Sequence, residues 1–236
     1  GGMGVLVFLL MILPMNGGYQ MFLMKAESPG PSVSKLVPKV RTTAMILYGI
    51  YMAMSVVQVV LLLIGDMPLF DALCTTFGSA GTGGFGIKND SMTSYSAYSQ
   101  VVTGIFMMLF GINFNVYFLL LMRHPKQALK CEEARWYIGI IAVSTGIITI
   151  FITNMYGSVG EALRHAFFQV SSIITTTGFA TTDFNLWPAS AKTILVMLMF
   201  IGACAGSTGG GIKVSRLIIL VKTIRKELKQ LLHPKN

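Results

Sequence analysis

The stretch SSIITTTGFATTDF, residues 171–184, lies between two long apolar runs and carries three consecutive threonines followed by a glycine. A second stretch, GSAGTGGFGIKNDS at residues 78–91, contains the same Thr-x-Gly-Phe core. The core begins at Thr82 in one stretch and at Thr176 in the other. We therefore expect a repeat protein in which each unit carries one such loop.

The composition is that of a membrane protein. Hydrophobic residues make up 53% of the 236 residues, charged residues make up 11%, and the mean hydropathy is +0.68, which is far from a soluble domain. A helix needs about 20 apolar residues to span a bilayer, and uncharged runs of that length occupy residues 42–65, 98–122 and 136–156. A fourth run starts at residue 194, is interrupted by glycines, and resumes over residues 212–221. These runs predict an all-α polytopic membrane protein.

The chain begins inside an apolar run, residues 3–15, without an initiator methionine. A secretory signal would begin with a basic stretch, and the opening letters GGMG do not. The sequence therefore suggests that an earlier part of the protein precedes residue 1.

Basic residues are distributed unevenly along the chain. All but three of the 18 lysines and arginines lie in residues 24–41, 123–135 and 213–236. By the positive-inside rule these segments are cytoplasmic, so we expect a multi-pass protein of the cell (inner) membrane. This topology and the anionic lipid head groups account for the net charge of +9. The basic segments lack interleaved aromatic residues, so no nucleic-acid partner is expected.

No group of side chains suggests covalent chemistry. Cys74, Cys131 and Cys204 are odd in number and lack metal-ligand spacing, so neither a disulfide nor a zinc site is expected. The three histidines are scattered and are expected at the surface or at interfaces. The spans and their surroundings offer no paired carboxylates and no nucleophile with a base. We therefore expect no enzyme and no covalent cofactor.

Each pair of spanning runs encloses a shorter apolar segment, LFDALCTTFGSAGTGGFG in one unit and EALRHAFFQVSSIITTTGFA in the next. An acidic residue, Asp71 or Glu161, lies near the start of each segment, where a helix N-terminus favours negative charge. Gly and Thr then break the helix. Because both flanking cytoplasmic loops lie on the inner side, the segment must enter the membrane from the outside and return there. We predict re-entrant pore helices at residues 69–80 and 161–174.

The loops after these pore helices, residues 81–86 and 175–180, are predicted to line a cation filter that opens to the outside. Irregular backbone at membrane depth is tolerated only where protein buries it or where it lines a watery cavity. Such backbone offers carbonyl oxygens, with threonine hydroxyls as further acceptors, and carbonyl rings can replace the water around monovalent cations. The glycines permit backbone angles that a side chain forbids. The candidate cation-binding residues are Gly81, Thr82, Gly83, Gly84, Thr175, Thr176, Thr177 and Gly178.

A packing role is the alternative for these loops, since glycine and other small residues are enriched where membrane helices approach closely. The same interval separates Thr82 from Thr176 and Gly84 from Gly178. Two copies at equivalent points of a repeat favour the filter interpretation.

A further glycine-rich stretch, GACAGSTGGGIKVSR at residues 202–216, interrupts the last spanning run. Its spacing adds one residue before the lysine of a nucleotide-binding P-loop, and no soluble strand precedes it, so a phosphate site is not expected. Lys213 is either a functional charge near the membrane or a lysine that extends to the cytoplasmic interface. The stretch predicts an unwound, mobile segment below the filter, formed by Gly206, Ser207, Thr208, Gly209, Gly210, Gly211 and Lys213.

The corresponding helix of the preceding unit reads LFGINFNVYF, residues 109–118. Aligning Gly111 with Gly202 places Asn113 opposite Cys204. A polar side chain within a span is expected to face the pore or another helix, so Asn113 is a possible pore-facing residue. Hydrogen bonding between helices remains the alternative.

The chain resembles the Trk/Ktr/HKT superfamily of potassium transporters, and most closely the bacterial Trk-type membrane subunit. The resemblance rests on GGMG at the start, KAESPGP at residues 25–31, LFDAL with TGGF within 69–85, AFFQVSS with TTTGF within 166–179, and GACAGSTGGGIKVSR at 202–216. Members of this superfamily have four units around one central pore. The chain looks like the end of the first unit followed by the second and third.

The resemblance implies the following division of the chain. The end of the first unit is expected at residues 1–23, followed by a cytoplasmic loop at 24–41. The second unit, 42–122, is expected to contain a helix at 42–65, a pore helix at 69–80, a filter loop at 81–86 and a helix at 98–122. After a cytoplasmic loop at 123–135, the third unit, 136–222, is expected to contain a helix at 136–156, a pore helix at 161–174, a filter loop at 175–180 and a broken helix at 189–222. A cytoplasmic tail is expected at 223–236.

The resemblance also implies a function and partners. Potassium is the expected bound substrate ion. Gly84 and Gly178 match the filter glycines of the superfamily. Residues 206–213 match the loop that gates permeation in the superfamily and are called the gate loop below. The full-length subunit is expected to form a homodimer and to bind a cytosolic nucleotide-binding regulatory subunit on its basic loops. Two rival interpretations remain: a non-conducting membrane scaffold for a cytosolic partner, and a cation-coupled secondary transporter with sites on broken helices.

Overall fold

A computed structural model of the protein describes residues 40–232. The expectations for residues 1–23, for most of the loop at 24–41 and for the last four residues lie outside this range. Within it the chain is helical, without strands, and its one isolated bridge joins Ile201 to Ile212. The all-α expectation is confirmed for the described residues.

Two of the described helices are long and apolar enough to cross a membrane, over residues Met45–Ile64 and Glu132–Met155. The first lies within α3 (Val40–Ile64), and the second joins α8 (Glu132–Ile152) to the short 3-10 helix η2 (Thr153–Met155). Large apolar side chains such as Val56 and Ile150 are exposed on these helices. Such exposure suits a lipid environment better than water.

Helices are present at both positions where pore helices were predicted. The first, α4 (Leu69–Ala80), follows Pro68 and has Asp71 in its first turn. The second, α9 (Val159–Ile174), starts two residues before its expected position because the Ser158 hydroxyl accepts a hydrogen bond from the Glu161 amide at 3.2 Å. A serine cap of this kind satisfies one of the free amides at a helix start. Both helices are shorter than a full span.

The predicted helix at residues 98–122 is instead two helices, α5 (Ala97–Phe110) and α6 (Phe114–Leu121), which meet at 90°. Asn113 causes the break, because its Oδ1 accepts a hydrogen bond from the Asn115 amide at 2.9 Å and caps the new helix. Gly111 fits at the corner, where a Cβ would lie 2.2 Å from the Tyr137 hydroxyl. Residues 98–122 contain no proline and are uncharged throughout, so hydropathy alone did not indicate the break.

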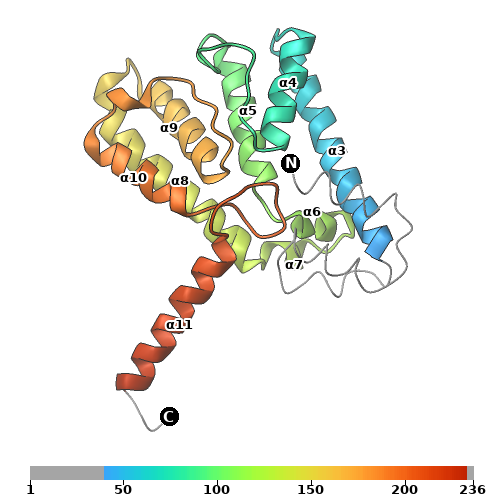
Figure 1. Cartoon of the computed structure of the whole chain (residues 1–236), viewed down its shortest axis with the longest axis vertical. Coiled ribbons are helices and arrows are strands. Elements are labelled where there is room, and N and C mark those ends of the chain that lie inside the picture. Colours follow the sequence, from blue (N-terminus) through green and yellow to red (C-terminus); the bar gives the residue numbers. More distant parts are fainter. Residues whose placement is uncertain (1–39, 233–236) are drawn as a thin grey trace.

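The remaining elements differ from expectation mainly at their ends. The predicted loop at 123–135 contains α7 (Pro125–Leu129) and the first turn of α8. The broken helix at 189–222 consists of α10 (Ala189–Phe200), an irregular stretch, and α11 (Val214–Leu232), preceded by the 3-10 helix η3 (Phe184–Leu186). Residues 223–232, expected as a tail, continue α11 as a helix. The apolar Val214 and Ile218 at its start pack into the core, while α11 projects away from the helices above it (Figure 1).

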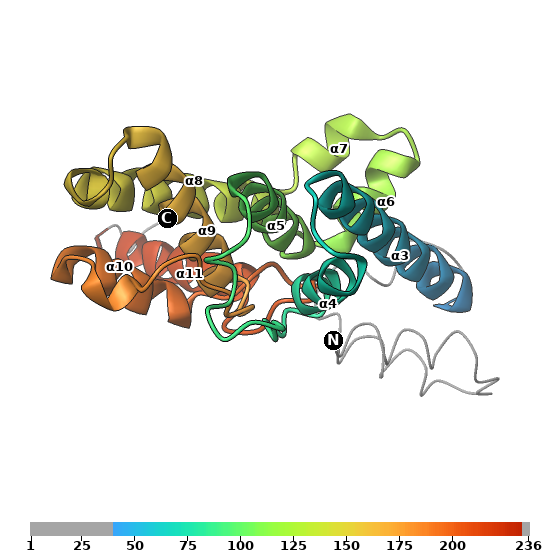
Figure 2. The same cartoon turned by 90° about the horizontal axis from the view of Figure 1, so that it is seen from above.

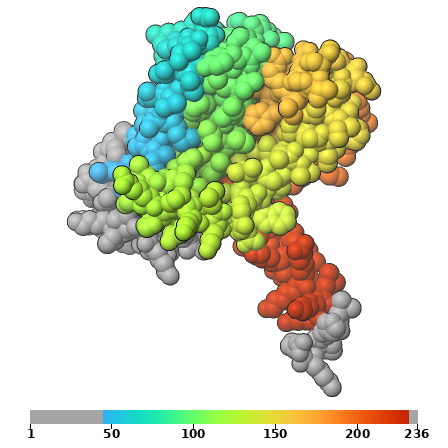
Figure 3. Space-filling view, turned by 180° about the vertical axis from the view of Figure 1, so that it is seen from behind, coloured from blue at the N-terminus to red at the C-terminus, as the bar shows by residue number. Residues whose placement is uncertain are grey.

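The two units lie side by side. One core cluster joins α3 through α6 around Leu62, Met107 and Phe110, and another joins α8 through α11 around Tyr137 and Ile174. Seen from above, α3 and α4 lie at one end of the molecule, α8 and α10 at the other, and α5 and α9 between them (Figure 2). The view from behind shows the two units as one continuous body from which α11 extends (Figure 3). Helices α5 and α9 are in contact where the two units meet. Their contact brings the ends of the two pore helices together.

Candidate functional site

The two filter loops share an unusual backbone conformation at equivalent positions. Thr82 and Thr176 have φ angles of 51° and 59°, and the glycines two residues later, Gly84 and Gly178, have φ angles of 63° and 96°. A β-branched residue rarely adopts positive φ, and each such residue costs about 1–3 kcal/mol. The same strain at the same place in both units points to a shared functional geometry.

The amides of the filter loops turn back toward the pore helices. The Gly83 and Gly84 amides donate to the Gly78 carbonyl at 2.8 and 3.2 Å, and the Thr177 amide donates to the Ser172 carbonyl at 2.9 Å. No backbone amide of residues 40–232 donates to the carbonyls of four filter residues, Thr82, Gly83, Thr176 and Thr177. These carbonyl oxygens are therefore available to a cation.

The side chains of the second filter loop hold its backbone in place. The Ser172 hydroxyl donates to the Phe179 carbonyl at 2.6 Å and accepts a hydrogen bond from the Gly178 amide at 3.1 Å. The buried hydroxyls of Thr175 and Thr177 lie 2.8 Å apart and bond to each other. These two hydroxyls thus support the loop, and the potential ligands at their positions are the carbonyls.

The two filter loops contact each other directly. A Cβ at Gly84 would lie 2.0 Å from the Thr177 carbonyl oxygen. The ring of Phe179 is fully buried, and a Cβ at Gly78 would lie 2.7 Å from it. Beyond the loops, the Met92 amide donates to the Ala180 carbonyl at 2.9 Å. The predicted cation-binding residues of both units therefore converge on one place.

The predicted gate loop fits into the break between α5 and α6. The Cys204 amide donates to the Gly111 carbonyl, and the Phe114 amide donates to the Gly206 carbonyl, both at 3.0 Å. The Thr208 hydroxyl donates to the Phe110 carbonyl at 3.2 Å. The gate loop thus supplies the hydrogen bonds that the bent helix cannot make within itself.

The same loop lies against both filter loops, through their equivalent threonines. The Thr82 hydroxyl donates to the Thr208 carbonyl at 3.0 Å, and the Gly210 amide donates to the Thr176 hydroxyl at 2.8 Å. There is no space for a side chain at Gly209, where a Cβ would lie 2.5 Å from that of Ala203.

Backbone geometry and Lys213 complete the gate loop. Gly206 and Gly211 have positive φ angles of 68° and 75°. The half-buried Lys213 donates from Nζ to the Gly209 carbonyl. The Lys213 side chain therefore joins the end of the loop to its middle. At the start of the loop, the Ser207 hydroxyl donates to the Cys204 carbonyl at 2.6 Å.

Asn113 forms a hydrogen bond to another helix, which was the alternative to a pore-facing position. Its side chain is buried, and its Nδ2 donates to Glu133 Oε2 at 3.4 Å. The sequence did not single out Glu133. Its only signal was a pair of glutamates where a basic segment leads into an apolar run, and such a pair is ordinary in a first helical turn.

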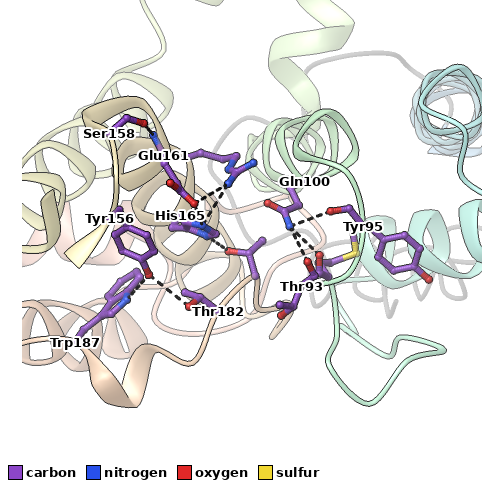
Figure 4. Close-up of polar contacts among 12 residues, drawn as sticks. Thr93, Tyr95, Gln100, Tyr156, Ser158, Glu161, His165, Thr182 and Trp187 are labelled. Carbon is purple, nitrogen blue, oxygen red and sulfur yellow. Dashed lines mark hydrogen bonds and ion pairs between the residues drawn. The ribbon is translucent and has the colours of Figure 1, made fainter. Parts of the chain in front are cut away.

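A polar network surrounds the first turns of α9 (Figure 4). His165 is buried, contrary to the expected surface or interfacial position, and its Nδ1 lies 2.8 Å from the Thr181 hydroxyl. The Tyr156 ring stacks on His165 with centroids 4.8 Å apart, and Trp187 Nε1 donates to the Tyr156 hydroxyl at 3.0 Å. Figure 4 shows these side chains meeting from the pore helix and from the segments that flank it. The network holds the chain that leaves the filter loop against α9.

These features define a class: a polytopic α-helical membrane protein built from repeated units of a helix, a re-entrant pore helix with its filter loop, and a second helix. The chain belongs to the TrkH family, described as cation transport protein, whose family model matches residues 1–236. The resemblance to Trk-type membrane subunits is thereby confirmed.

Named relatives agree with this membership. The Trk system potassium uptake protein TrkH of Salmonella typhimurium is 38% identical over 239 residues, which cover 99% of this chain and 50% of that protein. The protein of the same name from Escherichia coli K12 is 37% identical with the same coverage. The crystal structure of the potassium transporter TrkH from Vibrio parahaemolyticus matches with a TM-score of 0.84 and 31% identity, over 100% of this chain and 48% of that one. The chain spans about half the length of these relatives.

Proposed function

We propose that this chain forms part of a pathway for potassium uptake across a cell membrane. The observation that carries the proposal is the duplicated filter loop, with the same left-handed threonine and glycine in both units and with carbonyls that no described amide occupies. Carbonyl oxygens can replace the hydration shell of a potassium ion. The relatives named above are potassium uptake proteins, which agrees with this choice of ion.

Electrostatics at the ends of the pore helices support a cation rather than an anion. Helices α4 and α9 end at Ala80 and Ile174, directly before the filter loops. The C-terminal end of a helix carries a partial negative charge. Both pore helices therefore present that end to the place where the filter carbonyls converge.

We propose in addition that the filter needs loops beyond the two in this chain. The family resemblance implies four loops around the pore, and residues 81–86 and 175–180 supply two of them. The gate loop, within residues 206–213, would control passage, because it contacts both filter loops.

The topology and the partners are part of the same proposal. The basic segments would face the cytoplasm of a bacterial cell, and the filter loops would open to the outside. The full-length subunit would form a homodimer and bind a cytosolic nucleotide-binding regulatory subunit. The exposed basic residues of α11 offer that partner a surface: Arg216, Lys222, Arg225, Lys226 and Lys229.

Rubidium uptake by potassium-starved bacteria that lack their own uptake systems tests the function. The chain would be expressed alone and as a chimera in which it replaces the matching half of the Escherichia coli relative. We expect the chimera to restore uptake. Failure of a chimera that inserts normally into the membrane would refute the filter. Uptake that survives with Gly178 replaced by leucine would refute the assignment of this loop.

A non-conducting scaffold is the rival class. It predicts no ion uptake from the chimera and a loss of partner binding when the charges of residues 222–229 are reversed. The strained, repeated loops favour the conducting protein, because a scaffold has no use for them.

A further inference from the structure

We propose that Glu133 positions the gate loop, because its carboxylate binds both ends of that loop and fixes them to the start of α8. This inference rests on the proposed function for the meaning of the gate loop, but the contacts themselves do not depend on it. No sequence pattern marked Glu133.

The carboxylate of Glu133 joins segments that are far apart in the chain. Its Oε1 accepts hydrogen bonds from the Ala205 amide at 2.6 Å and from the Ser215 amide at 3.1 Å. Ala205 immediately precedes the gate loop, and Ser215 follows it. The other oxygen, Oε2, accepts the bond from Asn113 at the α5–α6 break. One side chain thus holds the two ends of the gate loop and the corner into which the loop fits.

The two bonds to backbone amides have physical reasons to be strong. Ser215 is the second residue of α11, so its amide has no acceptor within the helix, and negative charge is favourable at that helix end. Ala205 is buried, so its amide would lack an acceptor if the carboxylate left. Hydrogen bonds to an ionised acceptor are shorter and roughly twice as strong as neutral ones.

The neighbouring Glu132 serves as the natural comparison. Its carboxylate pairs with Lys222 on α11 at 2.5 Å, and both side chains are substantially exposed. An exposed ion pair contributes little, and no described bond connects Glu132 to the gate loop. Two adjacent glutamates therefore differ in role: Glu133 fixes the loop, and Glu132 contacts the outer part of α11.

Fixing both ends of the gate loop keeps its middle against the filter. Thr208 and Gly210, which bond to Thr82 and Thr176, lie between the two amides that Glu133 binds. If the carboxylate is removed, the ends can separate, and the loop loses the constraint that holds it below the filter loops.

The thiol of Cys204 reports on this constraint without any measurement of ion flow. Cys204 is fully buried beside the gate loop, and it would be the single cysteine of a chimera in which Cys74, Cys131 and any cysteine of the added half are replaced by serine. The rate of its modification by N-ethylmaleimide would be measured in membranes. We expect at least a tenfold higher rate in Glu133→Ala, an increase in Glu133→Gln, and a rate within twofold of the parent in Glu132→Ala.

A second reporter separates release of the loop from general unfolding. A cysteine introduced at the fully buried Ala72 of α4, with Cys204 replaced by serine, should stay slow to react in both Glu133 variants. Equal rates at Cys204 in the parent and in both Glu133 variants would overturn the proposal. A parallel rise at position 72 would also overturn it, because the effect would then be global.

Rubidium uptake in the same chimeras supplies the functional readout. We expect the maximal rate to change in Glu133→Gln while the KM for rubidium stays within twofold, because the filter carbonyls are not altered. A rise in KM without faster Cys204 modification would overturn the positioning role. Selective Cys204 exposure with no uptake even in the parent chimera would support the positioning role and refute the proposed function instead.

Discussion

Replacing Gly84 with alanine should damage the filter, whereas the same change at the neighbouring Gly83 should not. Gly84 has a φ of 63° and a Cβ there would lie 2.0 Å from the Thr177 oxygen. Real Cβ contacts stay beyond 3.0 Å, so one filter loop must move by about 1 Å. At Gly83, the nearest atom to a Cβ is in the ring of Phe85, at 3.2 Å, and that ring is 85% exposed and free to turn.

The backbone conformation alone sets the expected free-energy difference between the Gly84→Ala and Gly83→Ala variants. Left-handed backbone costs alanine about 1–2 kcal/mol, and alanine at a compatible glycine position gains about 0.4–1 kcal/mol from the unfolded state. The two variants should therefore differ by about 2 kcal/mol, which corresponds to roughly thirtyfold in an equilibrium constant. The third unit already carries a side chain, Thr177, at the position equivalent to Gly83.

The assay is the KM for rubidium uptake by the chimera, at equal amounts of membrane-inserted protein. We expect Gly84→Ala to raise the KM at least tenfold because it displaces the Thr177 carbonyl, and Gly83→Ala to stay near the parent value. An unchanged KM in Gly84→Ala, or equal damage from the two changes, would refute the argument that contact between the loops sets the carbonyl positions.

Two further predictions concern the hydroxyls that hold the loops. Ser172→Ala removes both the 2.6 Å bond to the Phe179 carbonyl and the acceptor of the Gly178 amide. We expect about 1–3 kcal/mol of destabilisation, read as a lower melting temperature in detergent, and a higher KM for rubidium. Thr193→Val, which removes an exposed hydroxyl on α10, is a control that should leave the KM unchanged. Thr176→Val deprives the Gly210 amide of its acceptor and should speed maleimide modification of Cys204, and an unchanged rate would show that this bond does not hold the loop.

Local pattern sufficed for the parts of the structure that depend on neighbouring residues. A helix was predicted at residues 69–80 and α4 occupies them, because an acidic first turn and a following Gly-Thr break are local signals. Gly84 and Gly178 have the positive φ angles that glycine permits, as expected, whereas the positive φ angles at Thr82 and Thr176 could not be read from residue type. The repeat interval identified which glycines correspond, and this required only the order of residues in the chain.

Apart from the local helix caps at Asn113 and Ser158, the interactions that the sequence did not predict join distant segments. Hydropathy cannot distinguish a straight span from one bent at Gly111, because the bend is stabilised by amides and carbonyls of residues 204 and 206. Glu133 was missed for the same reason, since its partners Ala205 and Ser215 approach it only in the folded chain. The sequence predicted the irregular stretch between α10 and α11 but did not indicate that this stretch fits into the α5–α6 break.

The hydrogen bonds between the α5–α6 break and residues 204 and 206 also affect the order in which the chain can fold. Residues 97–121 leave the ribosome well before residues 201–213, yet the Gly111 carbonyl and the Phe114 amide find their partners in the later segment. In a lipid environment each backbone group without a partner costs several kcal/mol. Until the later segment arrives, the earlier span must therefore stay straight or borrow other partners. The units resemble each other as repeats, but the backbone hydrogen bonding of the earlier unit is completed only by the later one.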